Sequence, residues 1–430
     1  MPKIPLPAGL TTNVSPRLAH LPQKSVLEIS GPDSQKFLKG LSCKDVDSLK
    51  GGYSGFLNAS GRVLHTSFIF PSTTTAGAST RQQPKYLITH ESPTDHPAPL
   101  QSLLPPFKLR AKVKIRDVSQ EWDAYSAWGV SNGFEAGSGK GKQPMRIWKM
   151  GSGGAAESQW SWEDGANGVR DLEIGEDELG CWDLRAGWMG MGRQILVPKG
   201  KKPSLSSSHD PTPADDYHLH RMLLGVPEGP DEIIPGSALP LESCMDLHGG
   251  VDFRKGCYLG QELTVRTYHT GATRKRILPI RLIPLNSSSS NTSNTTLLEH
   301  LTNPASSFPA SSSSGAAIPA DALGGLELTY HPPSSSASKK PRSAGKLLSL
   351  SPSSNVGLAL VRLEMAEKSC WATTGAEAGE NVLSLSVARW KEGGDFGKLI
   401  TKIGDVEYGV YVDQGEAYAA ALREMDAAVA

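Results

Sequence analysis

The 430-residue chain is long enough for about three domains, and its 44 Lys and Arg residues balance its 44 Asp and Glu residues, so the formal net charge is zero. This balance gives no indication of nucleic-acid or membrane binding that depends on a broad surface charge. No apolar run approaches the ~18 residues that a membrane-spanning helix needs, so we expect neither membrane insertion nor a nucleic-acid partner.

Residues 1–24 contain five prolines and no acidic residue. The lack of acids is typical of transit peptides, but these are also amphipathic and Arg-rich, and proline breaks the helix that they form. We therefore expect a disordered leader over 1–24, either a mature leader or the remnant of a presequence.

The next stretch alternates between strand and helix patterns. Strands are expected over 25–29, 53–57, 62–70, 85–89 and 111–118, with a continuation of the same sheet over 122–130. Asp33 can cap a short helix that carries Phe37 and Leu38, and a second helix is expected over 98–104. The order strand-helix-strand-strand-helix-strand predicts an α+β, ferredoxin-like unit.

The middle of the chain contains two predicted insertions, a Gly-rich one over 133–168 and a polar loop over 200–212. Between them, residues 181–197 return to a strand-like pattern. A helix over 215–224 follows, and Gly225 ends it. Its two histidines, His218 and His220, are two positions apart and therefore lie on different faces, which argues against a two-histidine metal site.

Strand patterns at 276–285, 345–350, 357–363 and 382–389 predict a small barrel or sandwich. A Ser-rich stretch over 286–340, interrupted only by a short apolar run over 326–330, cannot bury enough apolar surface to offset its chain entropy. We therefore expect a disordered insertion there, and a helical tail over 417–429. The domain division is leader 1–24, α+β region 25–275 and C-terminal domain 276–430.

The five cysteines form no C-x-x-C pair, which argues against a disulfide framework or a metal site held by this chain alone and fits a reducing compartment. They are Cys43, Cys181, Cys244, Cys257 and Cys370. Cys257 lies in the octapeptide KGCYLGQE at 255–262. Residues 251–253 alternate like a strand before it, and a helical pattern that Gly271 ends follows it. Cys257 is thus expected on a strand-to-helix turn, where the helix dipole and cations such as Lys255 and Arg266 stabilise a thiolate.

The alternative is that Gly256 and Gly260 only shape a turn and that Cys257 is a small buried hydrophobic residue. Its context favours the functional interpretation. The octapeptide, with LPLES at 239–243 and RKR at 274–276, resembles the signature of the YgfZ-type folate-binding family, relatives of the glycine-cleavage T protein. It is most similar to the eukaryotic mitochondrial branch, whose function is iron–sulfur cluster assembly. Residues 55–62 and 217–229 are also similar to this family.

The resemblance implies a glycine-cleavage T-protein-like ring of ferredoxin-like α+β modules with a C-terminal β-barrel, and tetrahydrofolate bound in or near its central hole. It implies a location in the mitochondrial matrix. It also implies a cofactor-binding set of Glu242, Lys255, Gly256, Tyr258, Gly260, Gln261, Glu262 and Arg266.

Several of these residues have a structural alternative. The Glu242 carboxylate suits the two N–H donors of a pterin edge, but it is equally compatible with a helix cap or the surface. Gln261 and Glu262 are better suited to capping the turn around Cys257 than to catalysis. The basic residues Arg266, Arg274, Lys275 and Arg276 fit either a folate tail, an acidic partner or a solvated face. Asp183 and Arg185 are expected to form a structural pair.

Three functions remain open. The first is a [4Fe–4S] assembly factor with Cys257 as a redox thiol or as ligand of a transient cluster, shared with A-type iron–sulfur carriers and recipient apoproteins because four ligands are usual. The second is a folate-dependent aminomethyl transferase, which needs no thiol. The resemblance disfavours it because neither 63–66 nor 88–92 supplies a clear acid at the family position. The third is a scaffold with a structural cysteine. The sequence favours the assembly factor over a catalyst.

Overall fold

The computed structural model describes residues 15–46, 51–72, 84–91, 99–129, 145–150, 156–161, 172–187, 190–285, 325–333, 340–351, 354–371, 397–413 and 418. The chain divides into two compact units. The larger comprises Thr12–Tyr217, Glu228–Ala272 and Ala417–Ala430, and the smaller comprises Met1–Thr11, His218–Pro227 and Thr273–Glu416. Most of the predicted insertion over 133–168, the strand over 382–389 and nearly all of the tail over 417–429 lie outside the described residues.

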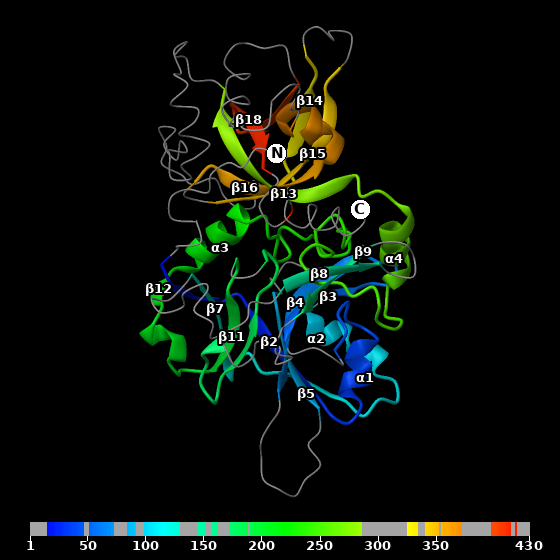
Figure 1. Ribbon diagram of the computed structural model, residues 1–430, viewed down its shortest axis with the longest axis vertical. Coiled ribbons are helices and arrows are strands. Elements are labelled where there is room, and N and C mark those ends of the chain that lie inside the picture. The colour runs from blue at the N-terminus through cyan, green and yellow to red at the C-terminus, as the bar shows by residue number, and fades with distance from the viewer. Residues whose placement is uncertain are drawn as a thin grey trace, which may run out of the picture. The chain divides into compact units, whose positions relative to one another are not determined.

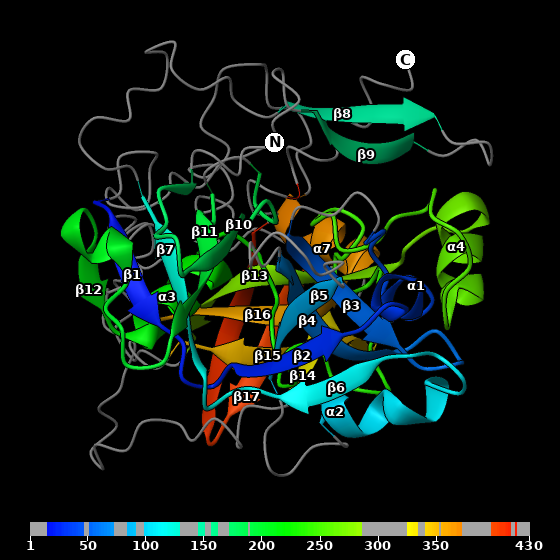
Figure 2. The same ribbon diagram turned by 90° about the horizontal axis from the view of Figure 1, so that it is seen from below.

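The first sheet of the larger unit confirms the predicted α+β pattern. Its five antiparallel strands follow the order β3-β4-β5-β2-β6. They are β2 (Ser25–Ser30), β3 (Gly52–Leu57), β4 (Val63–Ser72), β5 (Lys85–His90) and β6 (Lys114–Asp117). Alternate apolar residues such as Leu27, Ile69 and Ile88 form one buried core with α1 (Ser34–Lys39) and α2 (Leu100–Leu103). Figure 2 labels α1 and α2 together with the strands of this sheet.

The second sheet of the larger unit corrects three predictions, one of them because Asp210–Thr212 forms a strand inside the polar loop predicted over 200–212. It has the order β10-β11-β7-β1-β12. Its strands are β1 (Arg17–His20), β7 (Trp122–Trp128), β10 (Leu179–Trp182), β11 (Arg193–Pro198) and β12 (Asp210–Thr212). The stretch over 122–130 therefore does not continue the first sheet. The predicted disorder of the leader is wrong over Arg17–His20, because this segment pairs with both β7 and β12.

The larger unit also contains a separate hairpin and the helix that follows the octapeptide. The hairpin of β8 (Met145–Met150) and β9 (Ala156–Ser161) forms a sheet of its own, drawn at the top of Figure 2. The helix α4 (Gln261–Thr270) confirms the helix predicted after the octapeptide, and it follows Gly260 directly. The residues before the octapeptide are not a strand as predicted. The N–H of Asp252 bonds singly to the Cys43 carbonyl instead of joining a ladder.

The smaller unit contains a closed barrel in the order β13-β16-β15-β14-β17-β18, yellow-green to red in Figure 1. Its strands are β13 (Lys275–Pro284), β14 (Glu327–His331), β15 (Arg342–Leu350), β16 (Val356–Arg362), β17 (Lys398–Ile403) and β18 (Val406–Val412). After β16 come the short α7 (Leu363–Ala366) and the π-helix η5 (Glu367–Trp371). The barrel confirms the predicted C-terminal β-barrel. It also limits the predicted insertion over 286–340, because β14 lies inside that range and closes the barrel.

The remaining short helices confirm or refine the sequence analysis. The helix α3 (Ala214–Leu223) confirms the helix predicted over 215–224. The boundary between the two units falls within this helix, after Tyr217. Two 3-10 turns, η1 (Pro105–Phe107) and η3 (Ser204–Ser207), follow α2 and β11. The predicted cap of α1 by the Asp33 side chain is wrong. Its Oδ2 instead accepts a hydrogen bond from the N–H of Lys112 at 2.7 Å.

Candidate functional site

The segment around the octapeptide is fastened to the loop that follows α1, more than two hundred residues earlier in the chain. The Asp252 carboxylate accepts the Lys44 ammonium at 3.1 Å and the N–H of Asp45 at 2.8 Å. At the other end of the segment, the Leu259 N–H donates to the Gly40 carbonyl at 2.9 Å. These contacts fix the backbone on both sides of Cys257.

Lys255 has a structural role in this fastening. Its ammonium donates to the carbonyls of Lys39 at 2.7 Å, Ser42 at 2.5 Å and Lys44 at 3.2 Å, and it lies 4.6 Å from the centroid of the Tyr258 ring. Burial lowers its pKa to about 8. An ammonium has three N–H donors, so all the donors of Lys255 are occupied by the protein and none is left for a folate.

Cys257 projects from this fixed segment. Among the cysteines whose side chains the structure describes, Cys43, Cys181 and Cys244 are buried, and Cys257 is exposed. Burial raises the pKa of the Cys43 thiol to about 12 and also raises that of Cys181. The interpretation of Cys257 as a small buried hydrophobic residue is therefore wrong, and its thiol is the accessible one in this set.

The two glycines of the octapeptide occupy different environments. Gly260 has a φ of +78°, and a Cβ there would lie 2.3 Å from the Asn58 carbonyl oxygen, so the turn and the close backbone approach both require glycine. Gly256 has no positive φ, and a Cβ there would meet nothing within 4 Å. The fold does not need glycine at 256, beside the exposed thiol.

The other predicted residues surround this turn. The Gln261 Oε1 accepts the Tyr258 N–H at 3.3 Å, which confirms the predicted cap. Glu262 and Arg266 are exposed on α4, and the Tyr258 ring is buried. Arg274, Lys275 and Arg276 belong to the smaller unit, so a cation cluster beside Cys257 stays a prediction.

Two observations fit the folate that the family resemblance implies. The half-buried Glu242 carboxylate forms no side-chain hydrogen bond or ion pair with any residue that the structure describes. The neighbouring Ser243 hydroxyl is buried and likewise has no partner. Free oxygens of this kind can accept N–H donors of a pterin. Glu242 therefore fits the predicted role in folate binding. Lys255 does not, because its N–H donors are already bonded to backbone carbonyls.

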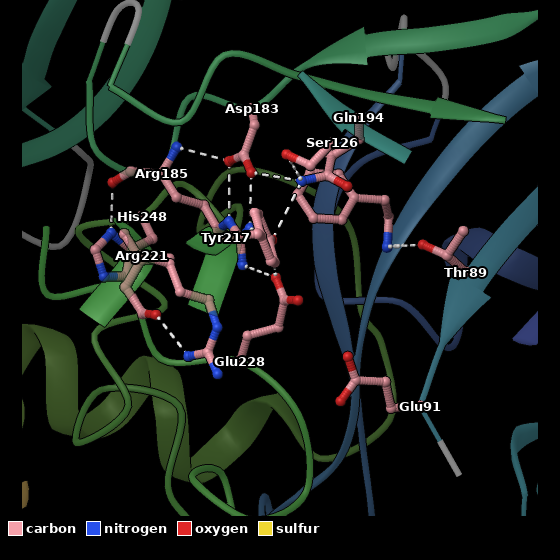
Figure 3. A network of polar contacts seen from close by, with 12 residues as sticks. Thr89, Glu91, Ser126, Asp183, Arg185, Gln194, Tyr217, Arg221, Glu228 and His248 are labelled. Atoms are coloured by element: carbon pink, nitrogen blue, oxygen red, sulfur yellow. Dashed lines mark hydrogen bonds and ion pairs between the residues drawn. The ribbon is translucent and has the colours of Figure 1, made fainter. Parts of the chain in front are cut away.

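A buried polar network, shown in Figure 3, was only partly foreseen. The fully buried Arg185 guanidinium donates to both oxygens of Asp183 at 2.9 and 2.7 Å, to the Tyr217 hydroxyl at 3.0 Å and to Glu228. Gln194 adds a bond to Asp183 at 3.1 Å. Although burial alone lowers it, Asp183 and Glu228 raise the pKa of Arg185. The predicted structural pairing of Asp183 and Arg185 is confirmed.

Lys24 has a buried position that was not predicted, since the sequence placed it in the leader. The Lys24 ammonium is buried and forms ion pairs with Glu228 at 2.6 Å and Glu91 at 2.8 Å. Glu91 directly follows β5, so an acid does stand at the end of the strand for which none was clear. Its charge is balanced by Lys24. A lysine before a predicted strand carries no sequence signal for burial, because its partners lie 67 and 204 residues away.

No group of three or more His, Cys, Asp or Glu side chains within the described part of the chain is placed to hold a metal ion. Within the same residues, no helix is long and apolar enough to cross a membrane.

Similar proteins identify the family. No family model matches the chain. It is 62% identical over 411 residues to the "Iron-sulfur cluster assembly factor IBA57 homolog, mitochondrial" of Cryptococcus neoformans strain JEC21, which covers 96% of this chain and 98% of that protein. The chain belongs to this family of mitochondrial iron–sulfur cluster assembly factors. Assembly factors of the same name from Neurospora crassa and Coccidioides immitis are 35% and 32% identical, over 62% and 91% of this chain and 54% and 81% of theirs.

The fold of this assembly-factor family member resembles a transferase. The crystal structure of the glycine cleavage system aminomethyltransferase T from Bartonella henselae matches with a TM-score of 0.51 at 12% identity, covering 95% of this chain and 88% of that one. At this identity the likeness shows the fold alone. It confirms the predicted T-protein-like α+β fold class, and the family membership gives a mitochondrial location.

Proposed function

We propose that the protein acts in the formation of [4Fe–4S] clusters or their transfer to recipient apoproteins in the mitochondrial matrix, with Cys257 as the reactive thiol. The name of the similar proteins supports the assembly role. The observation that carries the role of Cys257 is its exposure on a backbone segment fastened at Asp252, Lys255 and Leu259. A thiolate is a soft ligand that iron–sulfur clusters prefer.

The cluster is the cargo and is shared with a second molecule. One thiolate supplies one of the four ligands that a cluster usually has, so an A-type carrier protein, the recipient or a small thiol supplies the others. The open space beside Gly256 supports this arrangement, because a partner or cluster can approach the Cys257 backbone closely there.

Folate binding is the second part of the proposal. The partnerless Glu242 carboxylate supports a pterin site, and a bound tetrahydrofolate would supply one-carbon chemistry. Aminomethyl transfer is the less favoured activity. The acid at the strand end, Glu91, is already paired with Lys24, and the transfer does not use a thiol, so it would not explain the exposed Cys257.

The experiment is complementation of cells that lack the native factor. We expect the Cys257→Ser variant to fold with an unchanged unfolding midpoint but to leave a [4Fe–4S] enzyme without its cluster, since a serine hydroxyl is a poor soft-metal ligand. Cys244→Ser is the control for a thiol that is buried. Alkylation of the native protein with limiting iodoacetamide should label Cys257 before Cys43, Cys181 or Cys244. Full activity of Cys257→Ser would refute the role of the thiol.

Calorimetry with tetrahydrofolate tests the folate part separately. We expect heat and thermal stabilisation with the wild-type protein and at least about tenfold weaker binding to Glu242→Gln, since a hydrogen bond to a charged group contributes about 1.5–3 kcal/mol. Equal binding to both proteins would remove Glu242 from the site. No binding to either would remove folate from the proposal and leave the role of Cys257 untouched.

A further inference from the structure

The loop between η1 and β6 in the larger unit exposes apolar side chains to solvent. Residues 105–110 are six consecutive exposed positions. Phe107 is 44% exposed and Leu109 is 88% exposed, the largest fraction among the exposed large hydrophobic residues that the structure describes. Exposed apolar side chains that stand next to each other mark contact surfaces more often than single ones do.

The backbone holds Leu109 outward in an unusual conformation. Its φ of +44° is one that residues other than glycine rarely adopt, least of all a bulky one. Hydrogen bonds from Lys108 to the Pro105 carbonyl and from Ala111 to the Lys108 carbonyl, at 3.0 and 2.8 Å, fix the chain on both sides. Behind them, Val113 is anchored in the core. Backbone strain of this kind is often retained at functional sites.

Basic residues flank the two apolar residues along the chain. Four exposed cations within seven positions form no side-chain hydrogen bond or ion pair with any residue that the structure describes. They are Lys108, Arg110, Lys112 and Lys114. The next basic residue, Arg116, differs because it pairs with Glu28 and Glu121. The chain as a whole has no net charge, so this concentration of unpaired cations is a local feature.

We propose that residues 105–114 bind the surface of an anionic lipid bilayer, with Phe107 and Leu109 entering the interface and the four cations lying among the headgroups. Clustered Lys and Arg side chains are attracted to anionic lipids, and exposed apolar side chains beside them provide the second signal that stable membrane association requires. The two apolar side chains lie on an exposed loop. Such side chains can enter a lipid surface, because that surface is deformable and needs no preformed pocket to receive them. The attachment is peripheral and is independent of Cys257 and Glu242.

Flotation with vesicles tests this inference on the full-length protein. We expect binding to phosphatidylcholine vesicles that contain phosphatidylserine, little binding to pure phosphatidylcholine, and a steep loss when the salt concentration is raised. The double variant Lys108→Gln/Arg110→Gln should bind roughly 30-fold more weakly, at about fivefold for each cation. Leu109→Asn should weaken binding at least about fivefold, while its folding midpoint stays the same or rises.

Matched controls separate the loop from general effects of charge and apolarity. Lys202→Gln/Lys402→Gln removes two exposed cations elsewhere, and Ile234→Asn removes an apolar side chain that is 39% exposed. These variants should bind vesicles like the wild type. Equal binding of all variants, or equal binding to neutral and anionic vesicles, would overturn the proposal. It would also be overturned if the loop variants bound vesicles normally but lost cluster transfer to a recipient in lipid-free solution, because the loop would then be a protein interface.

Discussion

At the scale of single residues, the octapeptide combines positions that build the fold with positions that remain free for function. The sequence placed Cys257 correctly just before a helix, because the helical pattern and the capping residues are local signals. The structural role of Lys255 could not be predicted from local signals. Its three carbonyl partners lie 211 to 216 positions away, and only folding brings them together.

The two glycines of the octapeptide give the first prediction. Gly260→Ala should lower the free energy of unfolding by about 1–3 kcal/mol, because alanine is strained at positive φ and its Cβ would collide with the Asn58 carbonyl. Gly256→Ala should stay within about 0.5 kcal/mol of the wild type. Urea unfolding measures both. If Gly256→Ala folds normally but slows cluster transfer, close approach at Cys257 is supported. Equal destabilisation by the two variants would contradict the assignment.

The second prediction concerns His90, whose ring lies 5.6 Å from that of His65 on the neighbouring strand. Burial, reinforced by His65, lowers the pKa of His90 to about 3, whereas an unfolded histidine titrates near ~6.5. Between these values the unfolded chain binds a proton that the folded chain does not bind. Stability should therefore fall as the pH drops below about 6.5, with a slope of up to ~1.4 kcal/mol per pH unit.

His90→Gln isolates this contribution. Denaturant unfolding between about pH 7 and pH 4.5 should give a slope smaller by one proton for the variant than for the wild type. His209, whose pKa burial lowers to about 4, should still contribute its own slope in both proteins. The assignment fails if the two slopes are the same.

At the scale of elements, sequence patterns identified most strands of the first sheet, α1, α3, α4 and the start of the barrel. The errors came where the pairing is distant. Trp122–Trp128 reads as a strand, but only its ladders with Arg17–His20 and Arg193–Pro198 show which sheet contains it. The parallel pairing of β1 with β12 spans about 190 positions, and neither segment carries a local signal for it.

The third prediction tests the buried network that contains Lys24, Glu228 and Arg185. Lys24→Met leaves Glu91 without its cation and should lower the free energy of unfolding by about 3 kcal/mol, because a buried charge then has no partner. The double variant Lys24→Met/Glu91→Gln should recover part of the loss. Lys201→Met, in the exposed pair with Asp177, is the matched control and should leave the unfolding midpoint unchanged. A Lys24 effect no larger than that of Lys201 would refute the structural role.

At the scale of the whole molecule, the strand patterns predicted a C-terminal barrel but did not give the number of its strands. The strands β17 and β18 were missed, although Gly404-Asp405 between two alternating apolar runs is a hairpin signal. The apolar run over 326–330 marked the place of β14, but the Ser-rich composition around it gave no reason to assign it to the barrel, where its five residues pair with β15 and β17. Composition is an average over a window, and a strand this short changes the average little.

The last prediction separates the Ser-rich sequence from the strand behind it. Replacing residues 286–324 with a Gly/Ser linker of about ten residues should shift the thermal midpoint by less than about 5 °C, because this composition buries little apolar surface. Replacing 286–340 should unfold the barrel at a much lower temperature. It removes β14 and leaves the edges of β15 and β17 unpaired. Calorimetry of the two variants measures both midpoints. A large loss in the shorter replacement would mean that residues 286–324 stabilise the barrel, and equal midpoints would mean that β14 is dispensable.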